Sequence, residues 1–253
     1  MQTTSQKPSA WRTPQEVDQE RALSLRSKVD TTKSEIVEES TKDDDVAYLV
    51  DIGANLADKR FSHDMSEVVQ RAIDAGVRNI LITGTSIAAS KRAILLARTL
   101  PGILFATAGV HPHDAKSWLA RTNDELRRLV EENKDIVKAV GECGLDFDRN
   151  FSTPEQQIKA FREQLELACE LNLPVFLHER SAFDQLISIL KEYRPRLRGG
   201  VVHCFTGSQA ECEAYLSLDM HIGITGWICD ERRGMGLREV VKHIPWNRLM
   251  IET

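Results

Sequence analysis

Short apolar runs alternate with amphipathic stretches from residue 47 to the end of the chain. The apolar runs that predict buried strands are 47–52, 79–83, 104–109, 136–141, 174–178, 200–203, 220–224 and 248–252. Helical patterns between them cover 64–75, 86–99, 123–133, 154–171, 181–193, 208–217 and 235–243. Strands that alternate with helices pair in parallel, because each helix supplies a crossover. This pattern predicts an α/β fold, a (β/α)8 barrel of the TIM type, over residues 47–253.

Residues 1–46 lack this pattern and are rich in Thr, Ser, Gln, Glu, Asp and Lys. They carry seven basic and ten acidic residues, and therefore three of the five net negative charges of the chain. We expect a mostly disordered tail here, with room for one short helix that starts at Thr13. The chain contains no apolar core of a signal peptide and no run of 18 apolar residues, so we expect neither secretion nor a membrane-spanning segment.

The five cysteines are odd in number and show no C-x-x-C spacing. This usage favours a reducing compartment over a disulfide or zinc-finger framework. We therefore expect a cytoplasmic protein, with the nucleus or the mitochondrion as alternatives. Cys143 and Cys204 directly follow Glu142 and His203. In extended chain, alternation would turn both thiols away from these neighbours, so we expect packing residues.

A glutamate stands where the fourth apolar run ends. Glu142 follows Gly141 directly, and an acidic loop with Asp146 comes next, before a helix begun by Thr153 and Pro154. A carboxylate at the end of a buried strand needs a cation or hydrogen-bond donors to offset its desolvation. This segment alone leaves two interpretations open, a salt-bridged core carboxylate and a functional ligand.

Two later strands each end in a histidine, His178 after 174–178 and His203 after 200–203. A single histidine in such a place is more often a packed core residue. In a (β/α)8 barrel, however, the strand ends converge on the active site, so both histidines should meet Glu142. One carboxylate and two imidazoles suit a divalent ion in a catalytic site, because three protein ligands leave positions open for water and substrate.

Motifs along the chain resemble those of the TatD family of metal-dependent deoxyribonucleases. They are DIGANL at 51–56, GVHPHD at 109–114, GECGLDF at 141–147, FLHER at 176–180, VVHCFTG at 201–207 and GITGWICDERRG at 223–234. The similarity extends from about Val46 to the last residue in the same order and spacing. It implies a hydrolase that trims DNA, and RNA as a further substrate, from 3′ ends of single strands.

The resemblance also implies a role for individual residues. Glu142, His178 and His203 would be the catalytic metal ligands, with Mg²⁺ as the preferred ion and Mn²⁺ or Zn²⁺ as alternatives. His111 and His113 would position substrate or water, although two histidines two residues apart can also be metal ligands.

Asn55 belongs to the first strand end, where related hydrolases carry a His-x-His pair. It offers the substrate or a metal only one weak oxygen. This departure argues against a second, fully liganded metal.

Arg180 lies two residues beyond His178 and can face the same barrel mouth. Its planar guanidinium can bind a phosphate through two parallel hydrogen bonds. The alternative is a surface ion pair with Glu179 or Asp184.

Two further segments are weaker candidates for phosphate binding. Residues 206–208 lead into a helix whose free amides suit an anion. Arg232 and Arg233 follow the seventh strand, but Asp230 and Glu231 adjoin them. Two interpretations are therefore equally good: a phosphate clamp, in which the arginines bind substrate phosphate, and a self-neutralised loop, in which they pair with the neighbouring carboxylates.

The net charge of −5 bears on the partner. Proteins that coat duplex nucleic acid show a broad basic surface, which this composition does not provide. A single-stranded end that enters a pocket needs few phosphate contacts and fits the charge better. We expect a nucleic acid substrate, no membrane and no obligate protein partner. The alternatives are a small-molecule amidohydrolase or lactonase on the same barrel, and a catalytically weakened binding protein.

The last apolar run resembles the eighth strand of the family, whose pattern continues from Ile-Glu-Thr to an aspartate. The resemblance implies that this aspartate acts as general base, a role worth about 10²- to 10⁴-fold in rate. An eighth helix would follow it. Because the sequence stops at Thr253, it predicts a barrel without its last helix, as expected of a fragment, a truncated product or an isoform with low activity.

Overall fold

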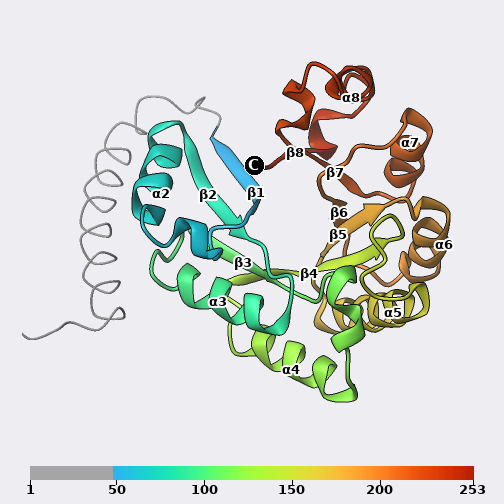
Figure 1. The fold of residues 1–253 in the computed structure, drawn as a ribbon, viewed down its shortest axis with the longest axis horizontal. Helices are drawn as coiled ribbons and strands as arrows, with labels where there is room; N and C mark the ends of the chain where they lie inside the picture. Colours follow the sequence, from blue (N-terminus) through green and yellow to red (C-terminus); the bar gives the residue numbers. More distant parts are fainter. Residues whose placement is uncertain (1–47) are drawn as a thin grey trace, which may run out of the picture. The chain divides into compact units, whose positions relative to one another are not determined.

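The computed structural model describes residues 48–253, which form a closed barrel of eight parallel strands in sequence order. The strands are β1 (Leu49–Ala54), β2 (Val77–Ile82), β3 (Leu104–Ala108), β4 (Val137–Asp146), β5 (Val175–Arg180), β6 (Gly200–Val202), β7 (His221–Ile224) and β8 (Leu249–Ile251). The helices between them are α2 (Met65–Asp74), α3 (Ile87–Ala97), α4 (Ala120–Glu131), α5 (Pro154–Leu171), α6 (Phe183–Tyr193), α7 (Gln209–Ser217) and α8 (Gly234–Val241). Figure 1 shows the strands at the centre with these helices around them. The predicted (β/α)8 fold is confirmed, and the predicted tail at 1–46 lies outside the described residues.

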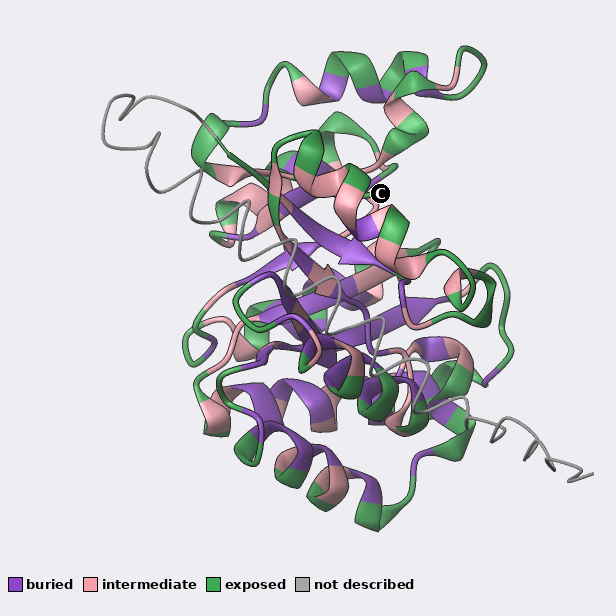
Figure 2. Ribbon diagram, turned by 90° about the vertical axis from the view of Figure 1, so that its left-hand side faces the viewer, coloured by how far each residue is buried: buried purple, intermediate pink, exposed green. Residues whose placement is uncertain are grey.

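Two layers of apolar side chains hold the barrel together. The larger one lies between the strands and the surrounding helices and contains fully buried residues such as Leu145, Leu177 and Phe161. The smaller one fills the barrel interior with Ile52, Ala139, Phe176 and Val201. Figure 2 shows the buried strands inside and the exposed helix faces outside. Successive residues of a strand thus point in turn toward the helices and toward the barrel interior, as expected for a parallel barrel that is covered by helices on its outer face.

Strands β4 and β5 extend further than their apolar runs predict. Glu142 and His178 therefore lie within strands and are not the last strand residues. The two strands stay paired in register beyond them, with Gly144 opposite His178 and Asp146 opposite Arg180. Backbone hydrogen bonding to a neighbouring strand continues regardless of side-chain polarity, so an apolar run marks only the buried part of a strand.

The start of α5 agrees with the sequence prediction. Thr153 and Gln156 form a capping box in which the backbone N–H of Thr153 donates to Gln156 Oε1 at 2.9 Å. Pro154 occupies the first turn, where its missing N–H costs nothing. Such a cap stabilises a helix by about 1 kcal/mol. The helix ends at Leu171, and the C-cap Asn172 adopts a left-handed backbone from which its N–H donates to the carbonyl groups of Ala168 and Cys169.

The two cysteines at the strand ends behave differently. Cys143 is fully buried in the layer between strands and helices, as predicted. Cys204 has a φ of 47°, so the chain turns there instead of staying extended, and the argument from alternation fails for this residue. Its Sγ lies 3.9 Å from Thr225 Oγ1.

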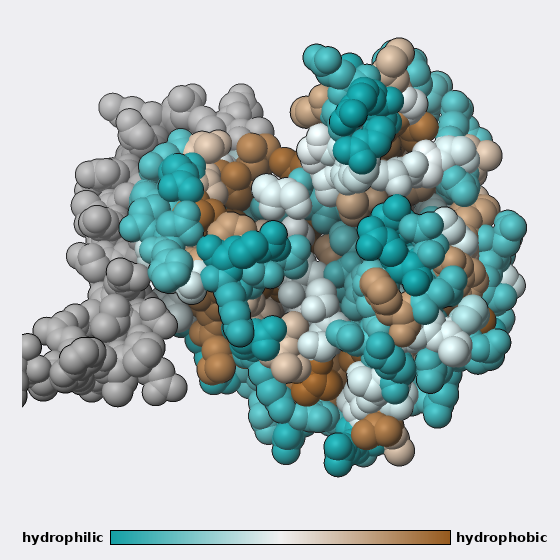
Figure 3. All heavy atoms as spheres, in the orientation of Figure 1, coloured by the Kyte–Doolittle hydropathy of each residue, from teal (hydrophilic) through white to brown (hydrophobic). Residues whose placement is uncertain are grey.

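The surface of the described part is mostly polar. Figure 3 shows hydrophilic residues over most of one face, with hydrophobic residues in smaller groups among them. Within residues 48–253, no helix is long and apolar enough to cross a membrane.

Candidate metal centre at the barrel mouth

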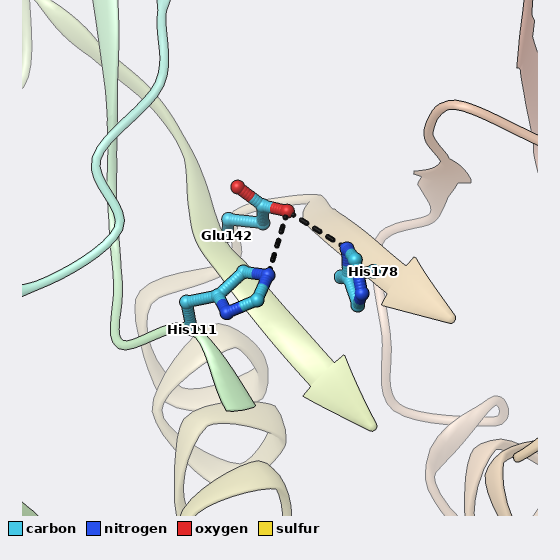
Figure 4. A group of neighbouring side chains, drawn as sticks. All are labelled: His111, Glu142 and His178. Carbon is cyan, nitrogen blue, oxygen red and sulfur yellow. Dashed lines mark hydrogen bonds and ion pairs between the residues drawn. The ribbon is translucent and has the colours of Figure 1, made fainter. Parts of the chain in front are cut away.

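A single carboxylate oxygen is the meeting point of three histidines at the carboxyl end of the barrel. Glu142 on β4 is only 6% exposed. Its Oε1 lies 2.7 Å from His203 Nε2, 3.0 Å from His178 Nδ1 and 3.3 Å from His111 Nε2. Figure 4 shows His111 and His178 converging on this oxygen. The structure thus brings together the three residues predicted as metal ligands and adds His111.

The local chain geometry explains how β4 and β5 come so close at this point. Gly144 has a φ of +142°, which side chains rarely tolerate. A Cβ at this position would also overlap the carbonyl oxygen of His178. Glycine therefore lets β5 lie directly against β4, which places the ring of His178 beside Glu142.

The hydrogen bonds of His111 distinguish it from the other two histidines. Its Nδ1 accepts the backbone N–H of His113 at 3.1 Å, so the proton of the neutral ring is on Nε2. This Nε2 faces Glu142 as a hydrogen-bond donor. Although ligand atoms of His111, Glu142 and His178 lie within 4.8 Å of one another, a protonated nitrogen does not bind a metal. The tautomer favours the positioning role predicted for His111 over the alternative of a ligand.

His203 has the opposite arrangement. Its Nδ1 lies 3.2 Å from Glu252 Oε2, so this nitrogen donates a proton to that carboxylate. Nε2, which faces Glu142 at 2.7 Å, is the nitrogen that can bind an ion once it has lost its proton. Its ring also stacks on Phe176, with 4.5 Å between the ring centroids. Two contacts therefore hold the His203 ring in place: the stacked Phe176 ring and the Glu252 carboxylate.

Glu252 is a buried carboxylate beside His203 that the sequence prediction missed. Its side chain is 1% exposed, and besides His203 it accepts the backbone N–H of Cys204. A Cβ on Gly53 would collide with the Glu252 carboxylate. The absence of a side chain at Gly53 therefore leaves room for this carboxylate in the barrel. The Glu252 backbone N–H donates to the Ile224 carbonyl at 3.1 Å. A glutamate that stands between an isoleucine and a threonine, just after a short strand, gives no sign of a partner 49 residues away.

Asp146 is a second residue without a predicted role. Its side chain is 2% exposed, and its Oδ2 lies 2.7 Å from His113 Nε2. Its Oδ1 accepts the backbone N–H groups of Asp148 and Arg149. Burial raises the pKa of Asp146, but the hydrogen bonds from Arg149 and His113 outweigh it and lower the pKa below its usual value. Asp146 is therefore an anion that fixes the orientation of His113.

Two buried glutamines of α5 bind the backbone at Val110, next to His111, and at Asp146, the partner of His113. Gln157 accepts the backbone N–H of Asp146 at 2.8 Å and donates to its carbonyl oxygen at 3.0 Å. Gln164 makes the same pair of bonds to Val110, at 2.7 Å and 3.0 Å. The two residues are seven apart and so lie on one helix face. One helix thus sets the positions of both His111, next to Val110, and Asp146.

Positive charge beside Glu142 stabilises its ionised form. Burial raises the pKa of Glu142, but the charge of His203 and hydrogen bonds from the three histidines hold it well below its usual range. Burial lowers the pKa of His203, but Glu142 and Glu252 outweigh it and raise the pKa. Burial lowers the pKa of His111, which is consistent with its neutral ring. A divalent cation would supply the positive charge that the proton on His203 supplies here.

The donor set fits such a cation. His178 Nε2 is buried without a hydrogen bond and lies 3.4 Å from Asp146 Oδ2. A buried polar atom without a partner is a position that a bound ligand can satisfy. One carboxylate and neutral imidazoles are ligands for divalent metals of the Mg²⁺, Mn²⁺ and Zn²⁺ group.

The other predicted site residues lie around this centre. Asn55 is exposed, and its carbonyl oxygen accepts the N–H of Asp58. Arg180 is half-exposed and pairs through Nε with Asp148 Oδ2 at 2.9 Å. The predicted alternative partners of Arg180 were wrong, because β5 extends to Arg180 and pairs it with the end of β4, where Asp148 follows.

The weaker phosphate candidates have partners within the chain. Ser208 caps α7 and forms a capping box with Glu211, which satisfies the amides at this helix start. Asp230 accepts both backbone N–H groups of Arg232 and Arg233 and pairs with the Arg233 guanidinium at 2.9 Å. The structure therefore favours the self-neutralised loop for Arg233.

A parallel barrel in which a carboxylate and histidines converge at the carboxyl ends of the strands defines a metal-dependent hydrolase. The model of the TatD-related DNase family matches residues 50–253, and the chain belongs to this family. The family is metal-dependent, and the chain is an enzyme of the hydrolase class.

Relatives and solved structures agree with this assignment. The 3′-5′ ssDNA/RNA exonuclease TatD of Erwinia amylovora is 54% identical over 205 residues, which make up 81% of this chain and 78% of the relative. A TatD family hydrolase from Entamoeba histolytica superposes with a TM-score of 0.74 at 35% identity, over 82% of this chain and 74% of the other. A TatD homologue from Escherichia coli gives a TM-score of 0.74 at 34% identity, over 81% and 78% of the two chains.

Proposed function

We propose that this protein is a metal-dependent exonuclease that removes nucleotides from the 3′ ends of single-stranded DNA, with RNA as a second substrate. The observation that carries the proposal is the convergence of Glu142, His178 and His203 on one point of the barrel mouth. The similarity to the 3′-5′ ssDNA/RNA exonuclease TatD of Erwinia amylovora supports the substrate class and the direction. The unpaired cysteines of the described part support a reducing compartment, for which we propose the cytoplasm.

Glu142, His178 and His203 would hold the ion, for which we propose Mg²⁺. When bound, it would supply Lewis acidity that polarises a phosphoryl oxygen and lowers the pKa of a water. Glu142 contributes the negative charge, and Glu252 keeps the proton of His203 on Nδ1, away from the site. His111, as a neutral donor through Nε2, orients the Glu142 carboxylate.

His113 and Arg180 would handle the substrate phosphate. Asp146 fixes the His113 ring through Nε2, as a carboxylate does for a histidine that orients a water or holds a proton. Arg180 pairs through Nε with Asp148, and its two terminal nitrogens would donate to phosphate oxygens. The substrate role of Asn55 stays a prediction, which its exposed position permits.

The proposal is tested with 5′-labelled and 3′-labelled oligonucleotides, single-stranded and duplex, in the presence of Mg²⁺, Mn²⁺ or Zn²⁺. We expect stepwise shortening from the 3′ end of single strands and no reaction in EDTA. A lactone and an aryl ester serve as small-molecule substrates under the same conditions. Faster turnover of these than of any oligonucleotide would favour the amidohydrolase or lactonase instead.

Arg180→Ala should raise the KM for oligonucleotides by about 10- to 150-fold and change kcat little, because one charge-assisted hydrogen bond to phosphate is worth roughly 1.5–3 kcal/mol. The matched control is Arg196→Ala, which removes an exposed ion pair with Glu166 at the far end of α6. An unchanged KM together with a shifted melting temperature would show that Arg180 only pairs with Asp148.

A further inference from the structure

An exposed tryptophan lies just beyond the end of β7. Trp227, in the 3-10 turn η3 (Gly226–Cys229), is 37% exposed although it is a large aromatic residue. The guanidinium carbon of Arg233 lies 3.9 Å from the centroid of its ring. One face of the indole is therefore covered by a cation, while the side chain as a whole stays accessible to solvent.

The Trp227–Arg233 pair is held in place by its own loop. Asp230 Oδ2 binds Nε and Nη2 of Arg233 at 3.2 Å and 2.9 Å. Thr225 Oγ1 accepts the backbone N–H of Trp227 at 3.2 Å, which fixes the start of the turn. An aromatic ring that is positioned before a partner arrives loses little conformational entropy when it binds.

The loop that carries the pair begins next to the metal centre. Thr225, two residues before Trp227, approaches Cys204, which directly follows His203. The backbone N–H of Phe205 donates to Gly223 on the adjoining strand at 2.9 Å, so the ends of β6 and β7 stay together. A Cβ built on Gly226 would meet no atom within 4 Å, so the chain beside Trp227 borders open space.

We infer that Trp227, backed by Arg233, is a stacking platform for a nucleobase of the single-stranded substrate. The inference rests on the proposed function and adds a subsite to it. Every nucleobase has an aromatic face, so stacking on indole binds single strands without regard to sequence. The Arg233 guanidinium holds the ring from one face by a cation–π interaction, so the indole is already oriented when a base stacks on the other face. The neutralisation of Arg233 by Asp230 fits a role in stacking better than a role as phosphate clamp.

The experiment compares two tryptophans of the same chain. Trp246 is 89% exposed and precedes β8, so it lies at the amino end of the barrel, away from the mouth. Binding of a phosphorothioate pentathymidylate and of its analogue with abasic residues is measured by fluorescence anisotropy for wild type, Trp227→Ala, Trp227→Phe and Trp246→Ala. Melting temperatures accompany each variant.

We expect Trp227→Ala to raise the Kd for the pentathymidylate by about 5- to 20-fold, the lower part of the range for one stacked base. The Kd for the abasic analogue should stay within twofold of wild type, Trp227→Phe should restore most of the affinity, and Trp246→Ala should change neither constant. Equal losses for both oligomers, or no difference between Trp227→Ala and Trp246→Ala, would overturn the inference. Failure of the wild type to shorten an ordinary oligonucleotide would instead contradict the proposed function, so the two failures are distinguishable.

Discussion

Glu142→Gln should reduce both metal affinity and nuclease activity by more than about 100-fold, beyond the roughly 10- to 100-fold cost of losing an outer-shell partner. Glutamine keeps the size of the side chain but removes the only charge among the three proposed ligands. The three imidazoles would then face a neutral amide, whose nitrogen is a donor like theirs. Isothermal calorimetry with Mn²⁺, together with oligonucleotide hydrolysis, measures the two effects separately.

The barrel should remain folded in this variant, because the amide fills the same space. Circular dichroism and thermal melting check this point. Glu166→Gln, on the exposed face of α5, is the matched control and should keep wild-type metal affinity. Unchanged metal stoichiometry and turnover in Glu142→Gln would exclude Glu142 as a ligand.

Glu252→Ala should weaken metal binding by about 10- to 100-fold, although Glu252 is not among the proposed ligands. Without its carboxylate, nothing holds the proton of His203 on Nδ1, and the Cys204 N–H loses its acceptor. The ring can then present a protonated nitrogen to the metal. Two-dimensional ¹⁵N spectra of the histidine rings should show a change in the His203 tautomer.

A loss of stability alone can also reduce metal binding, so a second variant separates the two causes. Glu252→Gln keeps an oxygen that accepts from Nδ1 and should recover most of the metal affinity. Glu239→Ala, an exposed glutamate paired only with Lys242, is the control. A wild-type tautomer and metal affinity in Glu252→Ala would limit Glu252 to packing.

The sequence was sufficient to predict the fold and to group the three proposed ligands. Eight apolar runs with helical stretches between them require parallel pairing, and parallel strands bring all their carboxyl ends to one face. Glu142, His178 and His203 could therefore be grouped without coordinates, because the order of strands alone places them together. The capping box at Thr153 was equally predictable, because its hydrogen bonds join residues three apart.

The groups that support these ligands could be recognised only in the folded chain. Glu252 and His203 meet across 49 positions, and Gln164 and Val110 across 54, through contacts that depend on the twist and closure of the barrel. Neither the type of these residues nor their spacing in the sequence indicates that they are in contact. The tautomer of His111 likewise follows from one backbone N–H at 3.1 Å. A pattern of apolar positions specifies which strand ends meet, but the protonation and orientation of a side chain depend on individual hydrogen bonds that only the folded backbone creates.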